Sequence, residues 1–297
     1  MSLTGILVVD KPAGWTSFDV IAKLRGVLGT RKLGHSGTLD PMATGVLPVF
    51  AGAASKAVDL QPDQNKTYLA TLRLGLATDT GDITGSVLKT APVTAGEAEL
   101  RAVLPGFVGQ RMQTPPMYSA VKIGGQPLYK LARAGKTVER AARPIVIYKL
   151  EYLGQLSECD HQLRIECGKG TYVRALAEEL GAALGLPAAL AALRRTRAGL
   201  FAEEQAHTLE EILAAKEAGG EEALARLLLG VDTVFAALPA LTVSQQAEAR
   251  LLNGAPVYRC AAPDGQYRLY TGAGGFLGLG RAEGRVLTAQ KLLIERK

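Results

Sequence analysis

The stretch Gly34-His35-Ser36-Gly37-Thr38-Leu39-Asp40-Pro41 is the most informative part of the chain. It is too rich in glycine and proline for regular structure, so it predicts an ordered loop, which the apolar run 46–50 would hold against a rigid scaffold. Asp40 is the one carboxylate of this loop, which disfavours glycosidase chemistry and metal coordination. A lone carboxylate suits a nucleophile or a single base, although an aspartate before proline is most often a turn former.

Strand and helix patterns alternate irregularly around this loop. Residues 6–9 form a short apolar run that ends in a turn, and 67–74 and 162–167 alternate between apolar and polar positions, which predicts strands. Apolar stripes at helical spacing predict one helix from a capping-box pattern at Thr16 to Gly29 and another over 173–184. Because no regular strand-helix-strand repeat occurs, the predicted fold class is α+β.

The sequence changes character near Pro239. A helical pattern over 244–252 is followed by short strand patterns at 267–270, 276–279 and 285–288, separated by glycine clusters. With 297 residues, the chain is long for one domain and comfortable for two. We therefore predict a catalytic domain over 1–237 and a small β-rich domain over 238–297.

The charges are separated along the chain. The net charge is +6, residues 121–149 hold seven Lys or Arg and one Glu, and residues 202–226 hold seven Glu and two basic residues. This pattern predicts a cationic lobe and an acidic, outward-facing helical segment. A basic lobe favours an acidic partner such as nucleic acid, although it could also be a solvated surface loop.

Other composition features exclude several classes of protein. Three cysteines without a CxxC pair and three widely spaced histidines argue against disulfides and a structural zinc site. The N-terminus lacks the pattern of a signal peptide, and no apolar run approaches the roughly 20 residues of a membrane helix. We therefore expect a soluble cytoplasmic protein with no membrane contact.

The loop at 34–47 resembles the catalytic-loop signature of TruB-type pseudouridine synthases. Further blocks are similar to the same family in the expected order, over roughly residues 5–200: they lie at 10–17, 66–68, 115–122, 168–176 and 193–195. The resemblance implies the pseudouridine synthase fold, a mixed and largely antiparallel sheet flanked by helices and loops. It also implies that the C-terminal segment is a PUA-like β-barrel.

The implied activity is isomerisation of the uridine at position 55, in the T-arm of tRNA, to pseudouridine. No cofactor or metal is expected, because moving the base from nitrogen to carbon needs no net oxidation or hydrolysis. The implied partner is tRNA, bound by a monomer that requires no protein partner. Two alternatives stay open: an RNA-binding chaperone that remodels tRNA without essential chemistry, and a guide-dependent synthase acting on ribosomal RNA.

The resemblance also implies residue roles at the reacting base. Asp40 is the nucleophile that acts on a flipped-out uridine. It attacks either the sugar carbon C1' or the uracil ring. Tyr68 stacks on the uracil and can help remove the final proton, and Arg174 pairs with Asp40 to keep it charged and aimed. Tyr172 and Leu193 line the base pocket. By spacing alone, Tyr68 and Leu193 would be core residues and Arg174 a solvated helix residue.

Further implied roles lie around this centre. Lys11 supports the Pro12 segment beneath the pocket, and His35 fills the space that the flipped base leaves; by itself it would be a loop hydrogen-bonder. Residues 121–149 correspond to a thumb insertion that folds onto RNA, and guide-dependent relatives are expected to have less of it. The thumb's candidate RNA-backbone contacts are Lys122, Lys130, Arg133, Lys136, Arg140 and Arg143.

Overall fold

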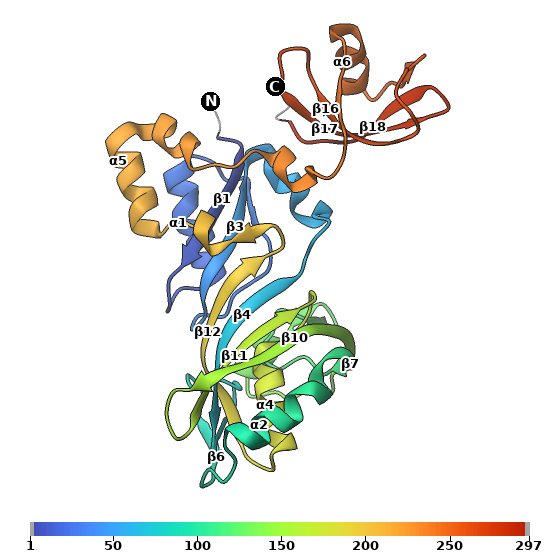
Figure 1. Ribbon diagram of the computed structural model, residues 1–297. Coiled ribbons are helices and arrows are strands. Elements are labelled where there is room, and N and C mark those ends of the chain that lie inside the picture. Colours follow the sequence, from blue (N-terminus) through green and yellow to red (C-terminus); the bar gives the residue numbers. More distant parts are fainter. Residues whose placement is uncertain (1–2, 295–297) are drawn as a thin grey trace. The chain divides into compact units, whose positions relative to one another are not determined.

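The computed structural model describes residues 3–294, and the chain divides into two compact units. The first contains the chain up to Leu39, Leu47–Asp63 and everything from Glu204 onward, and the second contains Asp40–Val46 and Gln64–Glu203. Strand β3 (Thr44–Ala51) contributes residues to both units. Figure 1 labels the larger helices and strands of both units.

The N-terminal part of the first unit is built on β1 (Gly5–Lys11), which lies beside β3. Helix α1 (Ser17–Leu28) begins at Thr16, whose hydroxyl accepts from the backbone N–H of Asp19, and ends at Gly29 in the left-handed conformation. The capping box and the C-terminal glycine expected for this helix are confirmed. The short strand β2 (Leu33–His35) pairs antiparallel with β3, so the prediction of a loop over the whole of 34–41 is wrong for Gly34 and His35. The 3-10 helix η1 (Gly52–Leu60) follows β3.

Helix α5 (Leu209–Arg226) is the acidic segment predicted from the charge pattern. It starts with a second capping box, at Thr208 and Glu211, and is broken at Gly219 and Gly220. Its glutamates are exposed to solvent: Glu210, Glu211, Glu217, Glu221 and Glu222. The outward-facing acidic helix is therefore confirmed.

The second unit is built around an antiparallel sheet. Its central strand β4 (Lys66–Leu74) buries Tyr68 and the other apolar residues of the alternating pattern, as expected. Helix α4 (Val173–Ala183) covers one face of the sheet, where Leu176 and Leu180 pack against residues of β4 and of β11 (Asp160–Cys167) (Figure 1). The strand order is β12 (Ala188–Ala198), β4 (Lys66–Leu74), β11 (Asp160–Cys167), β10 (Arg143–Gln155) and β7 (Gly109–Gln113), and α4 spans Val173–Ala183.

Strand β12 also pairs in parallel with the start of β3, where Arg194 lies opposite Thr44 and Arg195 opposite Gly45. Gly45 has a positive φ of 98°, and a Cβ atom there would collide with the carbonyl oxygen of Arg195. Only glycine therefore allows the two strands to approach this closely at this backbone conformation.

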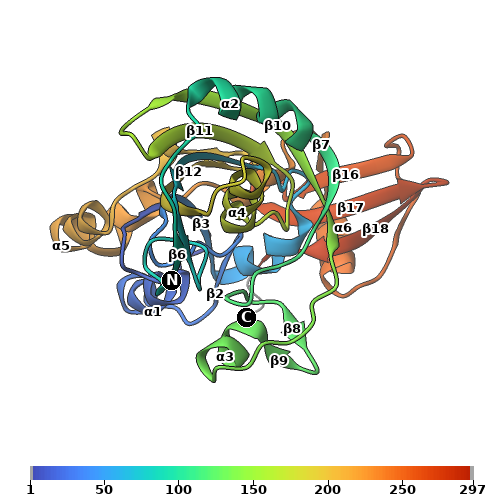
Figure 2. The ribbon, with the colours of Figure 1, turned by 90° about the horizontal axis from the view of Figure 1, so that it is seen from below.

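Smaller elements complete the second unit. The basic stretch 121–149 is not an irregular loop throughout. A hairpin of two two-residue strands and a short helix form within it. Figure 2 shows β8, β9 and α3 grouped together. The elements outside the sheet are β5 (Leu76–Thr78), β6 (Val87–Thr90), α2 (Glu97–Val103), η2 (Leu104–Phe107), β8 (Lys122–Ile123), β9 (Gln126–Pro127) and α3 (Leu128–Arg133). The short strand β13 (Phe201–Ala202) pairs antiparallel with the end of β12, and the 3-10 helix η3 (Glu203–Gln205) follows it.

The C-terminal segment forms a five-stranded sheet with its own hydrophobic core, centred on Leu251, Leu269 and Leu287. The helix and the three strands predicted after Pro239 are present. The last strand starts one residue later than predicted, because Arg285 and Gly284 form the turn before it, both with positive φ. Its elements are β14 (Ala240–Thr242), α6 (Gln245–Leu252), β15 (Val257–Tyr258), β16 (Gly265–Tyr270), β17 (Phe276–Glu283) and β18 (Val286–Leu292), preceded by η4 (Val231–Phe235). The boundary at 237/238 stays a prediction.

No helix within residues 3–294 is long and apolar enough to span a membrane.

Candidate active site

The Asp40 carboxylate and the Arg174 guanidinium form a two-point ion pair. Arg174 Nε donates to Asp40 Oδ2 at 2.8 Å, and Arg174 Nη2 donates to Asp40 Oδ1 at 3.0 Å. The Arg174 side chain is 5% exposed, whereas that of Asp40 is 34% exposed. The arginine side chain is thus buried, whereas the carboxylate is partly exposed to solvent. The interpretation of Arg174 as a solvated helix residue is therefore wrong.

Local structure explains how both residues reach this position. Asp40 begins a tight turn, in which the Ala43 N–H donates to the Asp40 carbonyl at 3.1 Å. Its role as a turn former and its side-chain contact therefore coexist. Arg174 is the second residue of α4, where a cation opposes the helix dipole. The paired carboxylate of Asp40 compensates for this unfavourable placement.

Arg174 also fixes two neighbouring backbone segments. Its Nη1 donates to the Thr80 carbonyl at 2.8 Å, and its Nη2 donates to the Tyr118 carbonyl at 2.7 Å. Tyr118 stands just before the basic lobe in sequence. One guanidinium therefore joins the Asp40 loop, the turn at Thr80 and the entrance to the lobe.

Asp82 is a neighbour of this centre that the sequence did not reveal. It is 5% exposed, and its Oδ2 lies 3.9 Å from Arg174 Nε. Its Oδ1 accepts from the Thr84 N–H at 2.9 Å and from the Thr80 hydroxyl at 3.0 Å. Asp40 is the one carboxylate of its loop, but the Asp82 carboxylate lies near the same arginine. The one signal in the sequence is an aspartate inside a threonine-rich turn, which is common in ordinary loops.

Tyr68 lies on β4, directly opposite Arg195 of β12 and Ile165 of β11. Burial raises the pKa of the Tyr68 phenol, and the Arg195 guanidinium partly offsets this by hydrogen bonding and charge. The negative charge of Asp40 also acts on the pKa of this phenol, in the raising direction. Tyr68 and Asp40 are therefore close enough to interact electrostatically.

The two expected pocket-lining residues belong to the same unit. Leu193 is buried on β12 opposite Ala70, two residues along β4 from Tyr68. Tyr172 caps α4, and its backbone is held from both sides by the buried Gln113 side chain. Gln113 Oε1 accepts from Tyr172 N at 2.8 Å, and Gln113 Nε2 donates to Tyr172 O at 3.2 Å. Gln113 is a positioning contact that the sequence did not suggest.

Lys11 and His35 belong to the first compact unit. Lys11 is fully buried, and its Nζ donates to the carbonyls of Pro12 at 2.8 Å and Trp15 at 2.6 Å. This is the segment that the family resemblance assigns it to support. His35 ends β2 opposite Val49 and is half-buried. Their roles toward a substrate stay predictions.

The basic side chains of residues 121–149 differ in exposure. Lys122, Lys130, Arg133, Lys136 and Arg143 are exposed, whereas Arg140 is half-buried. Arg140 Nη1 donates to the Pro115 carbonyl at 3.0 Å, and the Arg133 guanidinium lies 5.7 Å from the centre of the Tyr129 ring. Arg140 therefore attaches the lobe to the segment that precedes it, while the exposed residues present their charge to solvent.

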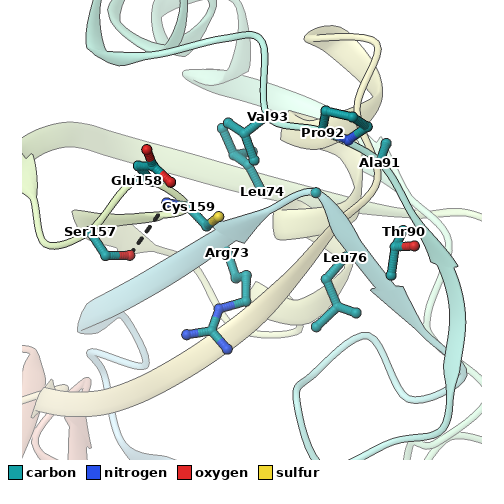
Figure 3. Close-up of a pocket in the computed structure, with 11 residues that line it drawn as sticks. Arg73, Leu74, Leu76, Thr90, Ala91, Pro92, Val93, Ser157, Glu158 and Cys159 are labelled. Carbon is teal, nitrogen blue, oxygen red and sulfur yellow. Dashed lines mark hydrogen bonds between the residues drawn. The ribbon is translucent and has the colours of Figure 1, made fainter.

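A cavity of about 680 Å³ lies elsewhere in the second unit, between the end of β4 and the loop at 157–159 (Figure 3). It is lined by residues such as Arg73, Leu76, Val93 and Cys159, and by no candidate site residue. Arg73 is occupied by a two-point contact with Asp160, at 2.8 and 2.7 Å. This cavity is therefore distinct from the candidate active site. Within residues 3–294, no group of three or more His, Cys, Asp and Glu residues is arranged to hold a metal ion.

Comparisons with known proteins agree with the geometry. A family model described as "TruB family pseudouridylate synthase (N terminal domain)" matches residues 25–173. Two C-terminal models match later parts of the chain: "tRNA pseudouridylate synthase B C-terminal domain" at 174–236 and "Pseudouridine synthase II TruB, C-terminal" at 239–293.

Curated relatives resemble the chain along nearly its whole length. The tRNA pseudouridine synthase B of Ectopseudomonas mendocina (strain ymp) is 46% identical over 285 residues, 95% of this chain and 93% of the relative. That of Pseudomonas aeruginosa (strain UCBPP-PA14) is 45% identical over 96% of this chain and 94% of the relative.

Solved structures show the same architecture. A chain from a crystal structure of a Cbf5-Nop10-Gar1 complex superposes with a TM-score of 0.72 at 28% identity, covering 98% of this chain and 85% of that chain. A chain from an H/ACA RNP bound to a substrate RNA containing 2'-deoxyuridine also gives 0.72, at 25% identity, covering 99% and 86%. The expected α+β fold of the pseudouridine synthase type, with a small β-rich C-terminal domain, is confirmed.

Proposed function

Because the chain belongs to the TruB family of pseudouridylate synthases, we propose that it converts one uridine in the T-arm of tRNA to pseudouridine, with Asp40 as the nucleophile. The observation that carries this proposal is the two-point Asp40–Arg174 pair. A buried, permanent cation grips an outward-facing carboxylate, which suits a group that must act on a substrate from a fixed position.

The reaction breaks the bond between uracil N1 and the sugar C1' and forms one between uracil C5 and C1'. Asp40 acts in the first step, by attack on either the sugar or the ring. The bond that Asp40 forms is broken again before the product leaves. The proton on C5 departs, its electron pair restores the C5–C6 double bond, and N1, which has lost its bond to the sugar, takes up a proton. Atoms and electrons balance without an oxidant, a reductant or water, so the residues of the site suffice.

Tyr68 supplies an aromatic face and a phenol oxygen within the electrostatic reach of Asp40. Stacking of a flipped base on an aromatic ring contributes about 1–3 kcal/mol. Tyr68 therefore holds the uracil while it turns and helps remove the C5 proton. Leu193 and Tyr172 line the pocket and exclude water, which limits loss of the detached base to hydrolysis.

The exposed cations of the thumb (residues 121–149) bind the phosphates of the T-arm, and His35 fills the gap in the RNA after the base flips. Lys11 supports the Pro12–Trp15 segment through its two backbone contacts. The C-terminal domain adds contacts to the distal part of tRNA. The enzyme acts as a monomer without a protein partner.

A guide-dependent synthase is the nearest alternative, since the superposed Cbf5 chain comes from a complex with Nop10 and Gar1. Two observations favour the stand-alone reaction. The two relatives named tRNA pseudouridine synthase B are 46% and 45% identical and match over nearly their whole length, against 28% identity for the Cbf5 chain. The exposed cationic thumb also offers the protein its own means of holding RNA. A chaperone without chemistry would not need the carboxylate–guanidinium pair.

The test is to incubate the purified protein alone with an unmodified tRNA transcript and with a ribosomal RNA fragment, and to map pseudouridine by reverse transcription after carbodiimide treatment. We expect one modified uridine, in the T-arm of the tRNA, without guide RNA or added protein. Modification of the ribosomal fragment alone, or no modification of either RNA by a folded protein, would contradict the proposed function.

A further inference from the structure

Arg195 is an arginine in the interior of the second unit. Its side chain is among the largest fully buried ones, and the residue is 1% exposed. Burying a guanidinium is costly unless its N–H groups are satisfied by specific partners. Its Nε donates to the Val46 carbonyl at 2.7 Å. This bond fixes the plane of the guanidinium, so the remaining N–H groups point in set directions.

One of those directions leads to Tyr68. Arg195 and Tyr68 are directly opposite in the antiparallel pairing of β12 and β4. Side chains at such positions stand on the same face of the sheet, with Cβ atoms about 4.5–5.5 Å apart. At this position the Arg195 guanidinium acts on the Tyr68 phenol by charge and by hydrogen bonding, both of which lower the pKa of the phenol. Because a guanidinium only donates, the phenol oxygen is the acceptor.

The other groups that act electrostatically on this phenol are negative or neutral. They are Asp40 from its loop and the Cys167 thiol from β11. Burial raises the pKa of Cys167 to about 11, so this thiol is neutral at physiological pH. Among these neighbours Arg195 alone is a cation, and it alone lowers the pKa of Tyr68.

We propose that Arg195 is the positioning residue of Tyr68: its buried guanidinium donates to the phenol oxygen, fixes the ring, and directs the oxygen's own proton and remaining lone pair toward the substrate. This inference rests on the proposed function, because it concerns the same reaction. Arg195 itself does not touch the uracil. Its effect on turnover therefore passes entirely through the Tyr68 oxygen.

The first test is a double-mutant cycle with Arg195→Lys and Tyr68→Phe, measured as single-turnover tritium release from labelled tRNA. Lysine keeps the charge but cannot hold two acceptors in one plane. We expect Arg195→Lys to slow the reaction about tenfold or more when residue 68 is tyrosine. It should have no further effect when residue 68 is phenylalanine. Equal losses in both backgrounds would mean that Arg195 is merely structural.

A matched control comes from the preceding residue. Arg194 is partly exposed and pairs with Glu203 through its Nε at 3.0 Å. Arg194→Lys should leave the rate nearly unchanged in either background. A loss as large as that of Arg195→Lys would show that any change in this part of β12 damages the site, and would remove the case for a specific role.

A second measurement needs neither turnover nor an Arg195 variant. In protein labelled with ¹⁵N-arginine and free of RNA, the buried Arg195 Nη protons should exchange slowly with water. Tyr68→Phe removes the acceptor but keeps the ring, so one protected guanidinium signal should shift and exchange faster. An unchanged arginine spectrum would overturn the proposal. This result is separable from the proposed function, because a protein that modified no tRNA would still show or lack the contact.

Discussion

Asp40 and Arg174 are 134 residues apart in the chain, yet their side chains meet through two hydrogen bonds of 2.8 and 3.0 Å. The remaining bonds of the same guanidinium go to the carbonyls of Thr80 and Tyr118. The position of the carboxylate is therefore set by a planar, multi-point donor and not by charge attraction alone.

Replacement of Arg174 by lysine tests this geometry. An ammonium group keeps the charge but cannot donate to both carboxylate oxygens and two carbonyls in fixed directions. We expect Arg174→Lys to lower the single-turnover rate about 10- to 100-fold or more. The control is Arg111→Lys, because Arg111 binds Glu179 of the same helix by one bond of 2.8 Å. Similar rates for wild type and Arg174→Lys would show that charge alone suffices.

Asp40→Asn tests the nucleophile. The amide has nearly the shape of the carboxylate but cannot attack carbon, so tRNA should bind with little change and no pseudouridine should form. Filter binding and tritium release measure the two properties separately. Persisting activity in a sample shown by mass spectrometry to carry the amide at this position, with no regenerated aspartate, would exclude Asp40 as the nucleophile.

The thumb should account for much of the salt dependence of binding. Each phosphate contact contributes about −0.7 to −0.9 to the slope of log affinity against log salt. Changing the exposed Lys130, Arg133 and Lys136 to glutamine should flatten the slope by about two to three units if all three contact phosphate. Arg226→Gln on the acidic helix α5 is the control and should not alter the slope. An unchanged slope in the triple variant would mean that these three residues do not contact phosphate and are ordinary solvated surface residues.

The buried thiol of Cys167 should weaken the fold in alkali. Burial raises its pKa to about 11, from an ordinary value of 9.0, so the folded chain keeps a proton that the unfolded chain releases between these values. The thiol's contribution is complete below pH 9, and the free energy of unfolding then falls by up to about 1.4 kcal/mol per pH unit as pH rises toward 11.

Urea unfolding of wild type and Cys167→Ala across this range isolates the thiol, since all other groups titrate in both proteins. The wild type should lose stability more steeply than Cys167→Ala. Cys159→Ala, which changes a partly exposed cysteine, should follow the wild type. Parallel curves for wild type and Cys167→Ala would mean that the thiol is accessible to water.

Truncation after Leu238 tests the proposed domain boundary. The C-terminal core is made of residues beyond the cut, and the candidate catalytic residues all precede it. The cut does remove the bond from the Tyr270 hydroxyl to Asp232, at 2.7 Å. We expect a folded enzyme that modifies an isolated T stem-loop normally but binds whole tRNA more weakly. Equal losses on both substrates, with unchanged circular dichroism, would mean that this segment helps build the site.

The sequence predicted best what local interactions determine. The capping box of α1 depends on contacts three residues apart, and the burial of Tyr68 follows from alternation along one strand. The loop conformation of Asp40 likewise follows from its glycines and Pro41. Such features are set by spacing within a few residues, which a single sequence displays directly.

Contacts between segments far apart in the chain could be predicted only from the family resemblance, and some could not be predicted at all. The Asp40–Arg174 pair was expected because both motifs match one family. Asp82 and Gln113 gave no usable signal, and Arg195 lies in a block that resembles the family but for which the resemblance implied no role. Each of these is a polar residue whose burial depends on strands or turns far away in the chain. Periodicity cannot distinguish such residues from ordinary surface positions, because their partners are chosen by the order of the strands.

Gly45 shows how activity can depend on a residue that takes no part in the reaction. It has no side chain and can take no part in any reaction, yet any larger residue would collide with the Arg195 carbonyl and separate the strand that follows Asp40 from β12. The same displacement would disturb Val46, whose carbonyl holds the Arg195 guanidinium. A genetic screen for inactive alleles would thus recover changes at a chemically silent position beside those at Asp40, and loss of function alone would not reveal which residues perform the reaction.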